Sequence, residues 1–248
     1  MVTLSRNYTT SQTPHTLRLM AALCGTGERR ILNNKTAKTL VCEVFEKLSN
    51  ANSVKDIESI VVNNKVLWKN RFNPSKYPEL KISLSAAEIS NLVGRGILTN
   101  ENKVSSQMEF SNLTPLEKIL YSVLWKNGDL GKERHIVEGV TAACMDVDDL
   151  NRDKSLVFYQ FGRHLANREE PIVDQHTIRA FLLFKYDGDE ESEITRIRKI
   201  AKVGKEDLAQ FKEWLNSHSC KNIENQFHID KVLFALGKAI KFKKQKNT

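Results

Sequence analysis

The sequence predicts a mostly α-helical protein, and two observations lead to this fold class. Apolar residues recur at the spacing of amphipathic helices through most of the chain, and helix-capping residues precede several of these stretches. From Thr114 onward, no stretch of useful length alternates apolar and polar residues as a half-buried strand does. We therefore expect a helical core over residues 111–248, preceded by a mainly helical region of unknown role over residues 1–110.

The N-terminal region contains two stretches that predict helices with one buried face. Thr36–Leu48 has its apolar residues at helical spacing, and Ser53 suits the N-cap of a second helix that ends at Val62. A shorter helical stretch, Thr16–Cys24, precedes them.

The following connector is where we place the boundary between the two regions. Two prolines, Pro74 and Pro78, predict a loop over Asn73–Leu84, in which alternating apolar residues leave room for a short strand. A short helix, Ala86–Val93, and a polar run to Ser106 complete the connector.

The C-terminal region opens with a clear helix start. Thr114 is an N-cap residue, Pro115 suits the first turn and Glu117 completes a capping box; Gly128 ends the helix. Periodicity predicts the later helices Lys132–Cys144, Lys154–Asn167, Gln175–Tyr186, Glu193–Val203, Lys205–Ser217 and Ile229–Phe242.

The charge of the chain favours a polyanionic partner. The 248 residues include 38 Lys and Arg against 30 Asp and Glu, a net charge of +8, and the pI is about 9.2. A basic protein attracts polyanions by releasing their condensed counterions, so nucleic acid is the expected class of partner.

Other classes of protein are disfavoured by what the sequence lacks. The four cysteines are scattered, without a C-x-x-C pair or a His at zinc-finger spacing, so we expect reduced thiols, no metal and no cofactor. No run approaches the roughly 18 apolar residues of a membrane span, and the start lacks an apolar signal core. We expect an intracellular monomer, in the cytoplasm and nucleoid or in the nucleus.

One lysine and one aspartate form the candidate catalytic pair. Lys154 is expected in the first turn of its helix, where the backbone N–H groups favour the neutral amine, a nucleophile. Pro171 ends the return from that helix, and Asp174 follows as an N-cap whose carboxylate could stabilise positive charge on a sugar. Twenty positions apart, the two side chains are expected to face one cavity.

The segment from Lys154 to Phe181 resembles the helix-hairpin-helix DNA glycosylases, the superfamily of endonuclease III and the 8-oxoguanine glycosylases. That family has a lysine at the start of a helix after the hairpin and an aspartate 18–20 residues later, after a short apolar pair, as in Ile172-Val173-Asp174. Ile229–Lys238 resembles the returning helix of its divergent members. The resemblance extends from about Leu113 to the end and is specific over some thirty residues.

The resemblance implies a glycosylase-like core whose partner is double-stranded DNA with a damaged or modified base. It also implies excision of that base after base flipping, with a further AP-lyase step if Lys154 forms a Schiff base. Asp174 would stabilise the charge on the sugar. The residues expected to contact DNA lie in the hairpin and in the two helices that follow it: Asn151, Arg152, Arg163, Gln175, His176 and Arg179.

Two alternatives stay open. The family hairpin has a glycine-containing turn before the lysine, whereas this chain has Asp149–Asp153 there, without glycine. This departure favours the alternative of a non-catalytic DNA-binding or repair-scaffold module. If the hairpin lies elsewhere, Lys126 or Lys132 replaces Lys154 as the nucleophile.

Overall fold

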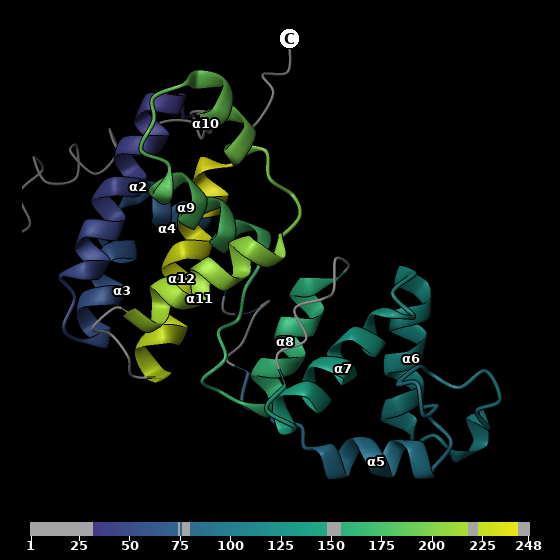
Figure 1. Cartoon of the computed structure of the whole chain (residues 1–248). Coiled ribbons are helices and arrows are strands. Elements are labelled where there is room, and N and C mark those ends of the chain that lie inside the picture. The colour runs from purple at the N-terminus through teal and green to yellow at the C-terminus, as the bar shows by residue number, and fades with distance from the viewer. Residues whose placement is uncertain (1–31, 74, 76–79, 148–154, 218–222, 243–248) are drawn as a thin grey trace, which may run out of the picture. The chain divides into compact units, whose positions relative to one another are not determined.

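The computed structural model describes residues 32–73, 75, 80–147, 155–217 and 223–242, with side chains left undescribed at 223–225. This part of the chain contains α-helices and one 3₁₀ turn but no strand; a single antiparallel bridge joins Leu98 and Val104 (Figure 1). The helices are α2 (Asn34–Ser49), α3 (Val54–Val62), α4 (Lys65–Asn70), α5 (Ala86–Gly94), α6 (Pro115–Asn127), α7 (Lys132–Cys144), α8 (Leu156–Ala166), α9 (Gln175–Lys185), α10 (Glu191–Arg198), α11 (Lys205–Ser217) and α12 (Ile223–Ile240).

The caps predicted from the sequence are present. The Ser53 side chain accepts a hydrogen bond from the Asp56 N–H, and Thr114 and Glu117 form a complete capping box ahead of Pro115. Gly128, at φ 68°, ends α6 in the left-handed conformation. These helices therefore begin and end where local chemistry satisfies the free backbone groups.

The larger of two hydrophobic clusters, called here the large cluster, joins α2–α4 to α9–α12. Phe45 stacks on Phe184 with ring centroids 4.1 Å apart, and Phe181 packs edge-on against Phe211. α12 crosses α9 closely at Gly237, where a Cβ would lie 1.8 Å from the His176 carbonyl oxygen. The large cluster thus includes residues from both sides of the boundary predicted near residue 110.

The second, called here the small cluster, is built from α5, α7 and α8 and the loops beside them. Its buried members are Ile89, Leu98, Val137, Val140 and Leu165. α7 and α8 cross at two glycines: a Cβ on Gly139 or Gly162 would lie 2.0 Å from a backbone oxygen of the other helix. The two helix backbones are therefore in direct contact.

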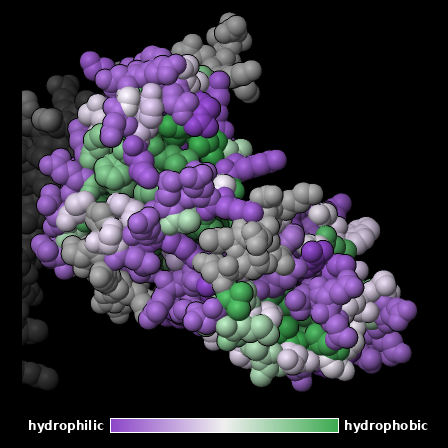
Figure 2. Space-filling model, viewed as in Figure 1, coloured by the Kyte–Doolittle hydropathy of each residue, from purple (hydrophilic) through white to green (hydrophobic). Residues whose placement is uncertain are grey.

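α6 differs from every other long helix in that none of its residues is buried. Leu116, Ile119, Leu120 and Val123 repeat at helical spacing, yet Leu116 is 64% exposed and Ile119 60%. Figure 2 shows hydrophobic surface in the region of α5 and α6. The predicted apolar stripe of α6 therefore exists but faces solvent.

Some predicted boundaries are wrong. The helix expected from Lys154 begins at Leu156, after Ser155 with φ 59°. α10 ends at Arg198, before the predicted end at Val203. The Phe242 N–H donates to the Arg198 carbonyl and the Arg179 guanidinium donates to the Ile200 carbonyl, so these carbonyls bond groups outside the helix. α12 begins at Ile223, six residues before the predicted start.

Two other elements differ from expectation as well. The sequence analysis missed α4, whose N-cap Asn64 accepts hydrogen bonds from the Val66 and Leu67 N–H groups. Residues 80–84 form no strand; the Leu84 N–H donates to the Leu165 carbonyl at the end of α8 instead. The helix predicted at Thr16–Cys24 lies outside the described residues.

Candidate functional site

Asp174, the predicted charge-stabilising residue, lies at the N-cap of α9. Its Oδ1 accepts hydrogen bonds from the backbone N–H groups of His176, at 2.7 Å, and Thr177, at 2.8 Å. Val173 before it is buried, and Asp174 itself is half-buried. The carboxylate is therefore held in one orientation at the positive end of a helix.

Thr177 connects Asp174 to a second carboxyl group. Its hydroxyl donates to Asp230 Oδ1 of α12 at 3.1 Å, while its N–H bonds Asp174. Burial and, to a smaller extent, the nearby Asp174 carboxylate together raise the pKa of Asp230 to about 8, against the opposing effect of the Thr177 hydrogen bond. Asp230 is therefore mostly protonated at neutral pH.

His176 lies on the first turn of α9, and Arg179 follows three residues later on the same face. Arg179 Nη1 donates to His176 Nδ1 at 2.7 Å and to the Gly237 carbonyl at 2.9 Å. Burial lowers the pKa of His176, despite the Asp174 carboxylate, so the ring is neutral and can accept this bond. Its other contact is edge-on to the Phe234 ring, at 5.0 Å.

A cavity of about 570 Å³ lies beside Asp230. Asp230 lines it, together with the chain just before Asp174 (Glu170, Pro171 and Ile172). The buried Gln226 Oε1, from another lining residue, has no hydrogen-bond partner among the described residues. The volume falls within the roughly 300–1,000 Å³ typical of small-molecule sites.

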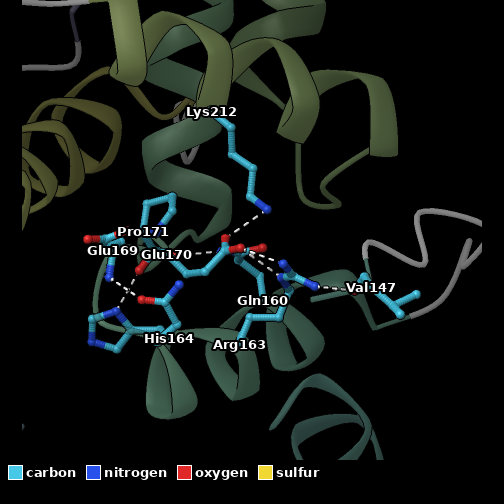
Figure 3. A network of polar contacts seen from close by, with 9 residues as sticks. Val147, Gln160, Arg163, His164, Glu169, Glu170, Pro171 and Lys212 are labelled. Carbon is cyan, nitrogen blue, oxygen red and sulfur yellow. Dashed lines mark hydrogen bonds and ion pairs between the residues drawn. The ribbon is translucent and has the colours of Figure 1, made fainter. Parts of the chain in front are cut away.

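Glu170 forms the centre of a polar network on another wall of this cavity (Figure 3). Arg163 donates to Oε1 through Nε and Nη2, at 2.9 and 2.6 Å, while Gln160 Nε2 and Lys212 Nζ approach Oε2 at 2.9 and 2.8 Å. Burial opposes ionisation, but the bonds from Gln160, Lys212 and Arg163 outweigh it and lower the pKa of Glu170 to about 2. This carboxylate ties α8 to α11.

His164 completes the network on the cavity side. Its Nδ1 donates to the Glu170 carbonyl at 2.7 Å, and Arg168 Nη1 donates to its Nε2 at 2.8 Å. Burial lowers the pKa of His164, which leaves the ring neutral and able to play both roles. His164 and Arg168 both line the cavity.

Three predicted site residues, Lys154, Asn151 and Arg152, lie outside the described residues. Of the alternative nucleophiles, Lys132 pairs with Asp129 and its ammonium lies 5.3 Å from the centroid of the Phe158 ring. Lys126 is exposed in the last turn of α6. Neither lysine lines the cavity described above.

The predicted DNA contacts that the structure describes differ in exposure. Arg163 and Arg179 are buried, and their guanidinium groups donate to Glu170 and to main-chain carbonyls inside the protein. In this conformation neither guanidinium is open to a DNA phosphate. Gln175 and His176, at the start of α9, are half-buried.

The sequence analysis missed Asp230, Thr177 and Glu170. The Thr177 position had a usable signal, since the backbone N–H three residues after an N-cap aspartate bonds that carboxylate. Asp230 had none, because its contact with Thr177 spans 53 positions.

Comparisons with known proteins add no assignment. No protein-family model matches the chain, and no curated protein or solved structure matches it significantly. Within the described residues, no group of three or more His, Cys, Asp or Glu side chains could hold a metal ion, and no helix is long and apolar enough to cross a membrane.

Proposed function

We propose that this protein is an intracellular DNA glycosylase that flips a damaged or modified base out of duplex DNA and excises it. The main support is the arrangement at the start of α9. Asp174 is fixed by two backbone N–H groups and joined through Thr177 to Asp230, on the wall of a cavity of about 570 Å³. A cavity of this size, with a fixed carboxylate linked to its wall through Thr177, suits a reaction that develops positive charge on a sugar.

The chemistry follows from the roles of the two predicted catalytic residues. Lys154 Nζ attacks C1′ of the flipped nucleotide, and the bond from C1′ to the base breaks with its electron pair leaving on the base. Asp174 stabilises the positive charge on the sugar. Loss of a proton from the nitrogen and opening of the ring give a Schiff base, from which elimination cleaves the strand. If water attacks instead, the enzyme is monofunctional.

The net charge of +8 supports DNA as the partner. Flipping requires a few kcal/mol of unstacking, which a damaged base offsets in part. Because Arg163 and Arg179 bond groups within the protein, the phosphate contacts are assigned to other basic residues.

Incubation with duplexes containing 8-oxoguanine, uracil, alkylated or hypermodified bases, with borohydride present, tests this proposal. We expect excision of at least one base and a trapped covalent complex. Lys154→Gln should abolish trapping, while Lys126→Gln and Lys132→Gln serve as matched controls that retain it. If one of the controls loses trapping while Lys154→Gln retains it, the lysine changed in that control is the nucleophile.

Asp174→Asn separates catalysis from binding. The amide still caps α9 but lacks the negative charge, so we expect excision to fall about 100-fold or more while salt-sensitive binding to DNA persists. If the wild-type protein excises no base, and if wild type and Asp174→Asn bind DNA equally well, the glycosylase assignment is contradicted and the non-catalytic binding module is favoured.

A further inference from the structure

Two carboxyl groups, Asp174 and Asp230, are linked through one threonine at the start of α9. Thr177, which is fully buried, donates its hydroxyl to Asp230 and its N–H to Asp174. Asp174 accepts two backbone hydrogen bonds, whereas desolvation and the nearby Asp174 carboxylate raise the pKa of the half-buried Asp230. Neighbouring carboxyl groups in different environments commonly divide acid and base roles between them.

Of the two, Asp230 is the one that borders the cavity. The other ionisable groups that line this cavity are Lys81, Arg168, His164, His228 and Glu170, and Lys231 lies next to Asp230 on α12. Arg168 donates to His164, and Glu170 is ionised within its own network. This leaves Asp230 as the carboxylic acid of the cavity that can release a proton near neutral pH.

We propose that Asp230 is the general acid of this site: its carboxyl, on the cavity wall and linked through Thr177 to Asp174, gives its proton to the departing base. The inference rests on the proposed glycosylase function. As the bond from C1′ to the base breaks, its electron pair passes to the base and the Asp230 proton joins that nitrogen or the conjugated ring system. Lys154 or a water supplies the new bond to C1′, and the proton released by that nucleophile passes through solvent to restore Asp230.

The role specifies which bases depend on Asp230. Uracil and 8-oxoguanine leave as anions unless they are protonated, so their excision needs the acid. N7-methylguanine carries a positive charge in DNA and leaves as a neutral base without a proton. A general acid therefore matters for the first class only.

The test measures single-turnover excision by the full chain with duplexes of both classes. Asp230→Asn should slow excision of neutral bases by about 100-fold, in the usual range for a general acid, and change N7-methylguanine excision by less than about threefold. Asp174→Asn, the matched control, should slow both classes. Thermal melts establish that both variants are folded.

The pH profile provides a second readout. Wild-type excision of neutral bases should fall as pH rises through about 8, where Asp230 ionises. The Thr177 hydrogen bond favours the ionised form, so Thr177→Val should move this fall to higher pH. Asp230→Asn should remove it.

The outcomes separate the inference from the function beneath it. If the wild type is active and Asp230→Asn excises bases as fast as the wild type, or is slowed equally on both classes of base, the general-acid role is overturned. The glycosylase assignment then remains intact. A wild-type protein inert on every duplex overturns both. If the wild type excises neutral bases only, the pH profile decides. A fall in excision as pH rises through about 8 that disappears in Asp230→Asn supports the general-acid role, and the absence of this fall overturns it.

Discussion

Two helices, α2 of the large cluster and the exposed α6, form in the same way but differ in how much of each is buried. α2 and α6 both have N-cap hydrogen bonds and apolar residues at helical spacing, yet α2 buries seven residues and α6 none. α2 packs against α3, α9, α10 and α12, whereas α6 leaves Leu116, Ile119 and Leu120 exposed. Periodicity thus predicts a helix, but burial depends on whether another element covers the apolar face.

The largest effect is expected from a change in the large cluster. Phe45 is fully buried and stacked on Phe184, so Phe45→Ala should lower the free energy of unfolding by about 4 kcal/mol through lost burial and a cavity. Chemical denaturation with circular dichroism measures the loss. A change below about 1 kcal/mol would mean that this cluster is no better packed than the surface of α6.

The next effect concerns the network that ties α8 to α11. Glu170→Gln leaves Arg163 and Lys212 without their carboxylate, and we expect a loss of about 3 kcal/mol at pH 7. The folded pKa of Glu170, about 2, lies below its ordinary 4.5, so its contribution is complete above 4.5 and is lost as pH falls through 2.

Denaturation between pH 7 and pH 2 checks this prediction. The wild type should lose its advantage over Glu170→Gln across the acid range. A difference that stays constant with pH would assign the loss to packing rather than to charge.

A smaller effect of opposite sign is expected at Asp230, on α12. The folded protein keeps a proton that the unfolded chain releases above its ordinary pKa of 3.8, so wild-type stability falls as pH rises from about 4 to 8. Asp230→Asn removes this dependence and should be about 2 kcal/mol more stable than wild type at pH 8. Melting curves at pH 5 and pH 8 measure the difference, which should be larger at pH 8; an advantage equal at both values would contradict the shift.

The smallest effect is expected on α6. Ile119→Ser exchanges an exposed apolar side chain for a polar one of lower helix propensity, and stability should change by less than about 0.5 kcal/mol. The same denaturation experiment measures it. Size-exclusion chromatography with light scattering should give a monomer for both proteins, and a loss above about 2 kcal/mol would reveal that this face is covered in solution.

Several features of the fold could be predicted because they depend on neighbours in sequence. Ser53, Thr114 and Asp174 cap their helices through bonds to N–H groups two or three residues away. Both ends of α7 and of α11 lie where the helical periodicity predicted them, because periodicity also depends on neighbours in sequence. The start of α8 could not be predicted, since Ser155 adopts a left-handed conformation that its side chain does not require.

The residues of the candidate site also differ in whether the sequence could predict them. Asp174 could be recognised from the apolar pair before it and the helix after it, since both are local. Asp230 could not, because its protonation depends on Thr177, Asp174 and the surrounding cavity, which lie far away in the sequence. Likewise, Arg163 and Arg179 look like surface cations in the sequence, and only folding encloses them.

Sequence alone therefore determined the helical class, most helix starts and the aspartate at the head of α9, because caps and periodicity act within a few residues. Tertiary structure decided which apolar faces are buried, which arginines donate to groups inside the protein, and that the Asp230 carboxyl keeps its proton at neutral pH. Those properties depend on desolvation and on partners brought close only by packing, so no local pattern contains them.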